Sequence, residues 1–259
     1  MQVRHHDMTA DLQVATLRDE IHLWTVDLDG TPRGLLGGSE TLSPDELVRA
    51  RRYRLERDRR RFIAARVGLR HLLARYLGMD PASVRFVSGE HGKPQLASAA
   101  SSWLRFSASH SESLAVFAVG RDREIGVDIE RVREDVDMEP VARRVLSIGE
   151  RADVDELPPD ARRRAFYRSW VRKEAVLKAL GDGLAVEPHE LDVTEDHVEL
   201  LTRDGLASLP AQSTTWSLHD VDLSPGYFAA LAIKGDLSNP PVVRGSITHA
   251  LATSYKTLA

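Results

Sequence analysis

Two acidic residues, Asp128 and Glu130, lie two positions apart in the run GVDIE (126–130). In a β-strand, residues two apart point to the same face, so these carboxylates would lie side by side while Val127 and Ile129 face the core. Neighbouring carboxylates repel unless a cation lies between them, and Mg²⁺ prefers carboxylate, water and phosphate oxygens. The pattern also fits a solvated strand face, so the pair alone leaves both interpretations open.

A second group of residues follows at helical spacing. Trp170, Glu174 and Lys178 are four residues apart and would share one face of a helix. An ordinary surface Glu–Lys pair has the same spacing and would contribute only about 0.3–0.5 kcal/mol. Gly181 and Gly183 come directly afterwards, and glycine can adopt a positive φ or let the backbone approach a ligand. The glycines therefore predict the end of the helix.

Two further motifs could bind phosphate. Ser109, His110 and Ser111 end a predicted strand and put two hydroxyls beside an imidazole, and Lys93 lies in a Gly-Lys-Pro turn (92–94). Lysine is a common phosphate ligand. A Ser–His hydrolase is the competing interpretation, but no nucleophile-elbow motif accompanies these residues. A lone histidine also fits a structural or solvated role.

Residues 49–61 contain eight arginines. Such a run indicates either a nucleic-acid-binding surface or a solvated helix face. Against nucleic acid, the whole chain has a formal net charge of -4 and shows no recognition fold. A nucleic-acid-binding module therefore stays as an alternative from a different class.

The composition excludes several classes of protein. The 259 residues include no cysteine, which excludes disulfide scaffolds, zinc–thiolate sites and cysteine nucleophiles. No apolar run reaches the roughly 18 residues of a membrane helix, and residues 1–12 hold no apolar signal core. We therefore expect a soluble, cytoplasmic protein that does not act in a membrane.

Helices and strands must position these motifs, and the sequence has helix and strand signals along its length. Ser43 and Pro44 predict the start of a helix, a second helix is predicted to end at Gly78, and a third covers residues 164–181. Strand-like runs lie at 21–28, 84–87, 104–109, 114–119, 125–129, 190–193 and 227–233.

The second half repeats the order of the first in weaker form. Aligning residues 164–181 with 60–78 matches apolar residues with apolar residues: Phe166 with Phe62, Val171 with Val67 and Leu177 with Leu73. Chance similarity of two amphipathic helices is the alternative. We expect an α+β fold built from a duplicated unit of about 110 residues, with an N-terminal unit at 1–133, a C-terminal unit at 134–259 and a peripheral tail from residue 238.

Four motifs occur in order along the chain: GKP (92–94), SHS (109–111), GVDIE (126–130) and W-x-x-KEA-x-x-K-x-x-G-x-G (170–183). This set resembles the Sfp-type 4′-phosphopantetheinyl transferases over roughly residues 45–233. The resemblance implies a pseudo-dimer of two similar α+β subdomains with the site between them. It also implies an Mg²⁺-dependent enzyme that moves the phosphopantetheine arm of coenzyme A to a serine of an acyl or peptidyl carrier protein and releases 3′,5′-ADP.

The resemblance also implies roles for individual residues. Asp128, Glu130 and Glu174 would hold Mg²⁺, and Glu174 would take the proton of the carrier serine, directly or through water. Lys178 would neutralise the departing 3′,5′-ADP. The remaining contacts to coenzyme A would come from Ser109 and His110 near the pyrophosphate and 3′-phosphate, and from Lys93, Arg61 and Arg49 at the adenosine 3′-phosphate end.

The sequence departs from the family pattern at two positions. Ser107 stands where the family often has Asn, and Glu46 stands near a position where some members have a basic residue that contacts the 3′-phosphate. The length favours the stand-alone, monomeric type of secondary metabolism (polyketide or nonribosomal peptide biosynthesis) over the short, trimeric type. Another Mg²⁺-dependent phosphotransferase or phosphodiesterase remains an alternative that the acidic cluster alone would also fit.

Overall fold

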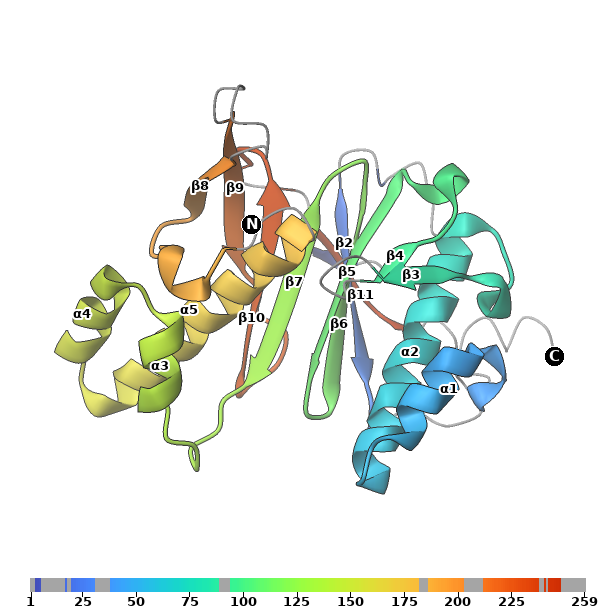
Figure 1. The fold of residues 1–259 in the computed structure, drawn as a ribbon, viewed down its shortest axis with the longest axis horizontal. Helices are drawn as coiled ribbons and strands as arrows, with labels where there is room; N and C mark the ends of the chain where they lie inside the picture. Colours follow the sequence, from blue (N-terminus) through green and yellow to red (C-terminus); the bar gives the residue numbers. More distant parts are fainter. Residues whose placement is uncertain are drawn as a thin grey trace.

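The computed structural model describes residues 3–5, 17, 20–30, 38–88, 94–181, 186–202, 212–237, 240 and 242–247. Two β-sheets lie side by side, and each carries one long helix (Figure 1). This arrangement confirms the predicted α+β fold. Among the described residues, none of the helices combines the length and the apolar character that crossing a bilayer requires.

The first sheet has five strands and is built mainly from the N-terminal half. Its spatial order is β1 (Val3–His5), β11 (Val242–Ser246), β2 (Ile21–Asp27), β6 (Leu114–Arg121) and β5 (Leu104–Ser111). A separate pair, β3 (Phe86–Ser88) and β4 (Pro94–Leu96), lies beside it. The predicted strands at 21–28, 104–109 and 114–119 are confirmed, and the run at 84–87 becomes a strand two residues later than expected.

The second sheet has four strands, in the order β7 (Ile125–Arg131), β10 (Tyr227–Lys234), β9 (Gln212–Asp220) and β8 (His197–Thr202). The GVDIE motif lies on β7, which pairs antiparallel with β10 along its whole length. The motif was expected in the N-terminal unit (1–133), and in the structure the backbone groups of β7 are bonded to β10, a strand from the C-terminal half.

Two expectations about the C-terminal half are wrong. The tail from residue 238 was expected to be peripheral, but residues 242–246 form β11 between β1 and β2, and Val242 and Val243 are buried there. The run 190–193 was expected to be a strand, but Pro188 opens a 3₁₀ turn, η7 (Pro188–Glu190), and no strand follows directly.

The helix predicted at 164–181 begins earlier, at Pro159, and the two short helices before it were not predicted, so the helices follow the local signals only in part. They are α1 (Pro44–Arg51), α2 (Glu56–Leu77), α3 (Glu139–Val145), α4 (Ile148–Glu156) and α5 (Pro159–Leu180), with 3₁₀ turns at η3 (Gly38–Thr41), η4 (Pro81–Ser83) and η5 (Ala99–Ser101). Ser43 caps α1 in a capping box with Glu46, and Gly78 ends α2 with a left-handed φ of 63°. Gly181 ends α5 with a φ of 61°.

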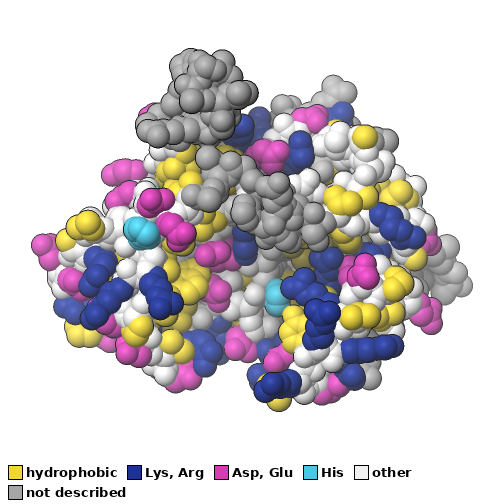
Figure 2. All heavy atoms as spheres, viewed as in Figure 1, with side chains coloured by type: hydrophobic (Ala, Val, Ile, Leu, Met, Phe, Trp, Pro, Cys, Tyr) yellow, Lys and Arg dark blue, Asp and Glu magenta, His cyan; other side chains and the backbone are white. Residues whose placement is uncertain are grey.

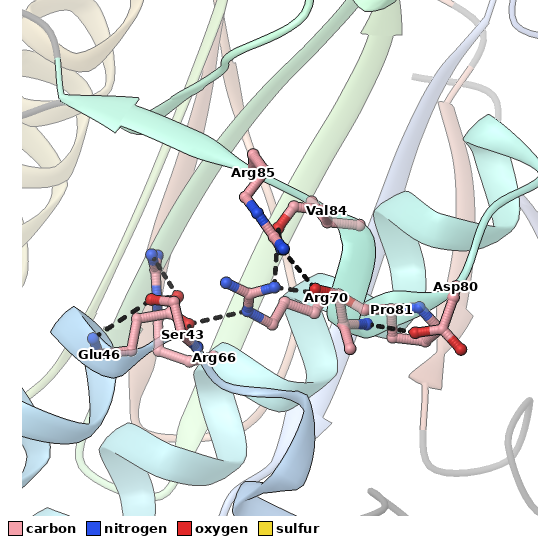
Figure 3. A network of polar contacts seen from close by, with 9 residues as sticks. Ser43, Glu46, Arg66, Arg70, Asp80, Pro81, Val84 and Arg85 are labelled. Atoms are coloured by element: carbon pink, nitrogen blue, oxygen red, sulfur yellow. Dashed lines mark hydrogen bonds and ion pairs between the residues drawn. The ribbon is translucent and has the colours of Figure 1, made fainter.

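Each half has one buried cationic side chain on its long helix that bonds to two other segments of the same half. In the first half, Arg70 on α2 bonds to Glu46 of the α1 capping box and to the carbonyls of Pro81 and Val84 (Figure 3). In the second half, Lys173 on α5 pairs with a capping-box glutamate of α4 and donates to two carbonyls at η7; these partners are Glu150, Pro188 and Leu191. This repeated arrangement supports the duplication. Because Arg70 corresponds to Lys173, the two long helices align one residue away from the alignment made on sequence alone.

The hydrophobic core has layers that follow the two sheets. Residues of α2 pack on β2, β5 and β6, and residues of α5 pack on β9 and β10. A third cluster joins the inner faces of both sheets, with Leu23 and Val116 from the first and Val127, Ile129 and Leu231 from the second. The two sheets are therefore packed on each other, and the strands β5 and β7 can meet at one edge.

Candidate active site

Three serines of β5 make the contact with β7. Ser107, Ser109 and Ser111 are two residues apart, so they share a face of the strand. Their hydroxyl groups cross the gap between the sheets: Ser107 Oγ accepts from Val127 N at 3.0 Å, Ser109 Oγ donates to Asp128 Oδ1 at 2.7 Å, and Ser111 Oγ donates to Glu130 Oε2 at 2.7 Å. The motifs SHS and GVDIE are thus joined directly. The Asn-to-Ser departure at position 107 leaves this hydrogen bond to β7 in place.

Lys178 completes the centre of the site. Its Nζ donates to Asp128 Oδ1 at 2.5 Å and to Ser109 Oγ at 2.8 Å. Asp128 is buried, whereas the Lys178 side chain is 31% exposed. Asp128 Oδ2 is buried and has no hydrogen-bond partner, an orphaned acceptor of a kind that is rare in folded proteins. Asp128 therefore has one oxygen, Oδ1, that accepts two hydrogen bonds, and one oxygen, Oδ2, that accepts none.

Gly126 allows α5 to approach β7 closely. A Cβ atom at this position would lie 1.9 Å from the carbonyl oxygen of Ala175 and 2.5 Å from the backbone nitrogen of Ala179. Both contacts are far shorter than atoms tolerate, so only glycine fits here. The close approach brings Glu174 and Lys178, one turn apart on α5, towards the carboxylates of β7.

Two carboxyl groups beside Asp128 have raised pKa values. Burial raises the pKa of Glu130, and the negative charges of Asp128 and Glu174 raise it further, against a hydrogen bond from Ser111. Burial and the charge of Asp128 likewise raise the pKa of Glu174, against the nearby Lys178. Raised carboxyl pKa values in one recess are typical of functional sites.

His110 lies where several cations converge. Although its side chain is exposed, desolvation lowers its pKa, and the positive charges of Lys178, Arg49 and Arg61 lower it further, against Asp128. The imidazole is thus favoured in its neutral form, surrounded by cations that come from α1, α2 and α5. An anion that entered this region would be attracted by all of them.

A pocket of about 720 Å³ lies beside α1 and α2. Arg49 and Arg52 line it, together with Arg66, Phe62 and Phe86. The charge of Arg49, which lines this pocket, also lowers the pKa of His110. Figure 2 shows Lys and Arg side chains on both halves of this face, including the half that carries α1 and α2, with the surface hollowed between the two halves.

Glu46 lines the same pocket but is buried at 7% exposure. Arg66 and Arg70 both bond to it at 2.8 Å, and its own capping box holds it at the start of α1 (Figure 3). The guanidinium groups of Arg66 and Arg70 also lie over the ring of Phe86. The acidic residue that departs from the family pattern therefore has a structural role here.

Arg61 differs from its expected role. Its Nε and Nη2 donate to the two carboxylate oxygens of Asp29 at 2.9 and 2.6 Å, and its Nη1 donates to Glu112 Oε2 at 2.8 Å. These hydrogen bonds raise the pKa of Arg61 and lower the pKa values of Asp29 and Glu112. With its side chain only 11% exposed, Arg61 faces carboxylates and not an open site.

Some of the remaining predicted site residues lie together in the structure, and others lie outside the described residues. Asp128, Ser109 and Lys178 are in direct contact. The charge of Asp128 acts on Glu130, Glu174 and His110, and the charge of Arg49 acts on His110. Lys93 and Gly183 lie outside the described residues. Sequence reasoning missed Ser111 as a partner of Glu130 and Glu112 as a partner of Arg61, although the spacing of 107, 109 and 111 could have revealed the shared serine face.

Two family models match the chain. The model described as "4'-phosphopantetheinyl transferase superfamily" matches residues 124–232, and the model "4'-phosphopantetheinyl transferase, N-terminal" matches residues 31–121. The border between the two matches falls at the start of β7, where the structure also passes from the first sheet to the second. Fold, site and family models together define a phosphopantetheinyl transferase.

Individual relatives agree with this class. The chain is 39% identical over 221 residues to the 4′-phosphopantetheinyl transferase HetI of Nostoc sp. (strain PCC 7120), covering 85% of this chain and 90% of the relative. It is 28% identical over 192 residues to the transferase Sfp of Bacillus subtilis (strain 168), covering 73% and 81%. It is 35% identical over 149 residues to the transferase AcpT of Salmonella typhimurium, covering 57% and 73%. The chain belongs to the 4′-phosphopantetheinyl transferase family, as its motifs predicted.

Proposed function

We propose that this chain transfers the 4′-phosphopantetheine arm of coenzyme A to a serine of an acyl or peptidyl carrier protein. The observation that carries the proposal is the convergence of Asp128 from β7, Ser109 from β5 and Lys178 from α5, beside the carboxyl groups of Glu130 and Glu174. Transfer of a phosphoryl-type group depends mainly on positioning and charge neutralisation. This site combines carboxylates and cations at one place.

Glu174 is the proposed base. The serine oxygen forms a bond to the phosphorus that carries the pantetheine arm, the bond from that phosphorus to 3′,5′-ADP breaks, and the serine proton passes to Glu174, directly or through water. The raised pKa of Glu174 suits this task, because a base works best when its pKa lies near the working pH. Lys178, with its partly exposed ammonium group, neutralises the departing 3′,5′-ADP.

Mg²⁺ would be held by Asp128, Glu130 and Glu174. Their chemistry fits, because Asp128 Oδ2 is a buried oxygen without a partner and the charge of Asp128 raises the pKa of both glutamates. Within the described part of the chain, no three His, Cys, Asp or Glu side chains already stand as a metal site. Lys178 neutralises Asp128 in this arrangement, so binding of the ion would require the carboxylates to rearrange. The bound ion would supply positive charge to the pyrophosphate.

The nucleotide end of coenzyme A would lie on the N-terminal half. Arg49 lines the 720 Å³ pocket and also acts on His110, so a ligand phosphate near His110 would face this arginine as well. Phe62 and Phe86 add apolar ring surface to the same pocket. Lys93 follows from the family resemblance alone and is proposed for the same end of the ligand.

The test is mass spectrometry of a purified apo carrier protein incubated with the enzyme, coenzyme A and Mg²⁺. The expected result is a gain of one phosphopantetheine on the carrier, and no gain when the carrier serine is replaced by Ala or when Asp128→Asn enzyme is used. A chain that hydrolyses or transfers phosphate without modifying the carrier would instead be another Mg²⁺-dependent phosphotransferase.

We further propose that the enzyme acts as a cytoplasmic monomer. One chain supplies the whole constellation, with Asp128 and Glu130 on β7 and Glu174 and Lys178 on α5. Light scattering should give the mass of one chain, and an obligate trimer would contradict this.

The arginine run offers little support for nucleic-acid binding, since Arg57, Arg59 and Arg61 each pair with a carboxylate. A shallow salt dependence in filter binding would agree with that.

A further inference from the structure

The turn between β5 and β6 has an unusual conformation for its sequence. Glu112 follows His110 and Ser111 directly and has a left-handed φ of 49°. Side chains other than Gly, Asn and Asp adopt this region rarely, because Cβ crowds the backbone there. Such a conformation persists where the surroundings hold it, and it often marks a functional segment.

Several contacts hold this turn. Arg61 on α2 donates to Glu112 at 2.8 Å, while its other nitrogens donate to Asp29 in the turn after β2. The backbone of Leu28 donates to Ser113 at 2.7 Å, and the Ser113 hydroxyl lies 3.3 Å from the hydroxyl of Tyr227 on β10. The turn is thus fixed to the N-terminal half by Arg61 and reaches the C-terminal half through Ser113.

We infer that Arg61 is a positioning residue that acts through Glu112, and that it does not bind coenzyme A. By holding Glu112, Arg61 fixes the end of β5, where His110 faces the cations of the site and Ser111 holds Glu130. All three nitrogens of the guanidinium group are engaged by carboxylates, so a substrate phosphate would have to displace an existing ion pair. This role rests on the proposed transfer reaction.

The two possible roles of Arg61 predict different kinetic effects when Glu112 is replaced. If Arg61 binds coenzyme A, replacing Glu112 removes a competing negative charge and frees Arg61 for the polyanionic substrate, so KM for coenzyme A falls. If Arg61 acts through Glu112, the same replacement releases the turn and lowers kcat. Glu112→Asn is the appropriate change, because Asn tolerates a left-handed φ but is too short to keep the contact with Arg61.

The experiment compares Arg61→Met, Glu112→Asn and the double variant by steady-state transfer, with thermal melting to establish that each is folded. Each single variant should lower kcat about tenfold with KM for coenzyme A within about twofold, and the double variant should be no worse than either single one. Arg61→Lys keeps one ion pair and should recover part of the loss. A rise in KM of about tenfold for Arg61→Met, with KM unchanged or lowered in Glu112→Asn, would overturn the inference.

A matched control lies at the other end of β6. Asp122 also has a left-handed φ, of 48°, and pairs with an arginine, Arg121, but lies in the turn before β7 and away from the SHS motif. Asp122→Asn should leave kcat and KM unchanged. Hydrogen exchange over residues 106–118 should be faster in Arg61→Met and Glu112→Asn and unchanged in Asp122→Asn. This readout needs no activity, so it decides the role of Arg61 even if the wild-type chain modifies no carrier; unchanged exchange in both variants overturns the inference.

Discussion

Arg70 and Lys173 occupy equivalent positions in the two halves of the chain. Each lies buried on the long helix of its half, at 1% and 0% exposure. Each bonds to the capping-box glutamate of the preceding helix and to two carbonyls of the following 3₁₀ segment. Lys173 is the lysine of the KEA motif, and this contact set makes it a structural residue, while its neighbour Glu174 faces the site.

Loss of either buried cation should destabilise the protein strongly. Lys173→Met leaves Glu150 buried without its partner, and we expect a loss of about 3–5 kcal/mol in the free energy of unfolding, measured with urea. Arg70→Met should behave similarly. The double variant Lys173→Met/Glu150→Leu should recover most of the loss, since no charge remains unpaired. Arg143→Ala, which breaks an exposed pair with Glu139, serves as the control and should change stability by less than about 0.5 kcal/mol. A small effect of Lys173→Met would disprove the structural role of this buried lysine.

The carboxyl cluster should cost stability in the enzyme without metal. Because the folded pKa values of Glu130 and Glu174 are raised, their stabilising contribution is complete only below the unfolded value of 4.5 and is lost as the pH rises through the folded pKa. At neutral pH, Glu174→Gln should therefore raise Tm by about 2–4 °C while removing most turnover. Differential scanning calorimetry with chelator, beside the carrier assay, checks both effects. A lower Tm in the variant would contradict this account.

Local features of the fold could be predicted from the sequence, whereas long-range ones could not. The cap at Ser43, the stops at Gly78 and Gly181 and the same-face pair Asp128 and Glu130 depend on nearby residues, and the structure has them as predicted. The place of β11 between β1 and β2 depends on a pairing with residues more than 200 positions away, which no local pattern encodes.

The candidate site shows the same division. Strand and helix periods predicted the shared face of Asp128 and Glu130 and that of Glu174 and Lys178, because each motif is local. That the two motifs meet followed only from the family resemblance, and the structure has Lys178 bonded to Asp128 and Glu174 under the influence of its charge. The ion pairs of Arg61 could not be predicted, since an arginine in a basic run gives no sign that Asp29 and Glu112 take its donors. Its partners lie 32 and 51 residues away in the chain.

Binding of coenzyme A should be coupled to proton uptake by His110. In the free enzyme, desolvation and the charges of Lys178, Arg49 and Arg61 lower the His110 pKa, so the neutral ring is favoured at pH 7. A bound phosphate would favour the charged ring and raise this pKa, so affinity should weaken as the pH rises from about 6 to 8. Isothermal titration in buffers of different ionisation enthalpy measures the uptake. His110→Ala should bind without it, and equal uptake in that variant would assign the proton elsewhere.

Lys178 should contribute more to turnover than to substrate affinity. In the free enzyme its ammonium group neutralises Asp128 Oδ1, and in the reaction it would meet the charge that develops on 3′,5′-ADP as the bond to phosphorus breaks. An interaction that strengthens only in the transition state lowers kcat and kcat/KM together when it is removed. Lys178→Met should therefore reduce kcat about 100-fold or more, with KM for coenzyme A changed only a few-fold. The variant also leaves Asp128 buried without its cation, so its Tm should fall, and Asp128→Asn in the same chain should restore the Tm without restoring transfer. Near-wild-type turnover in Lys178→Met would reduce the Lys178–Asp128 contact to a structural ion pair.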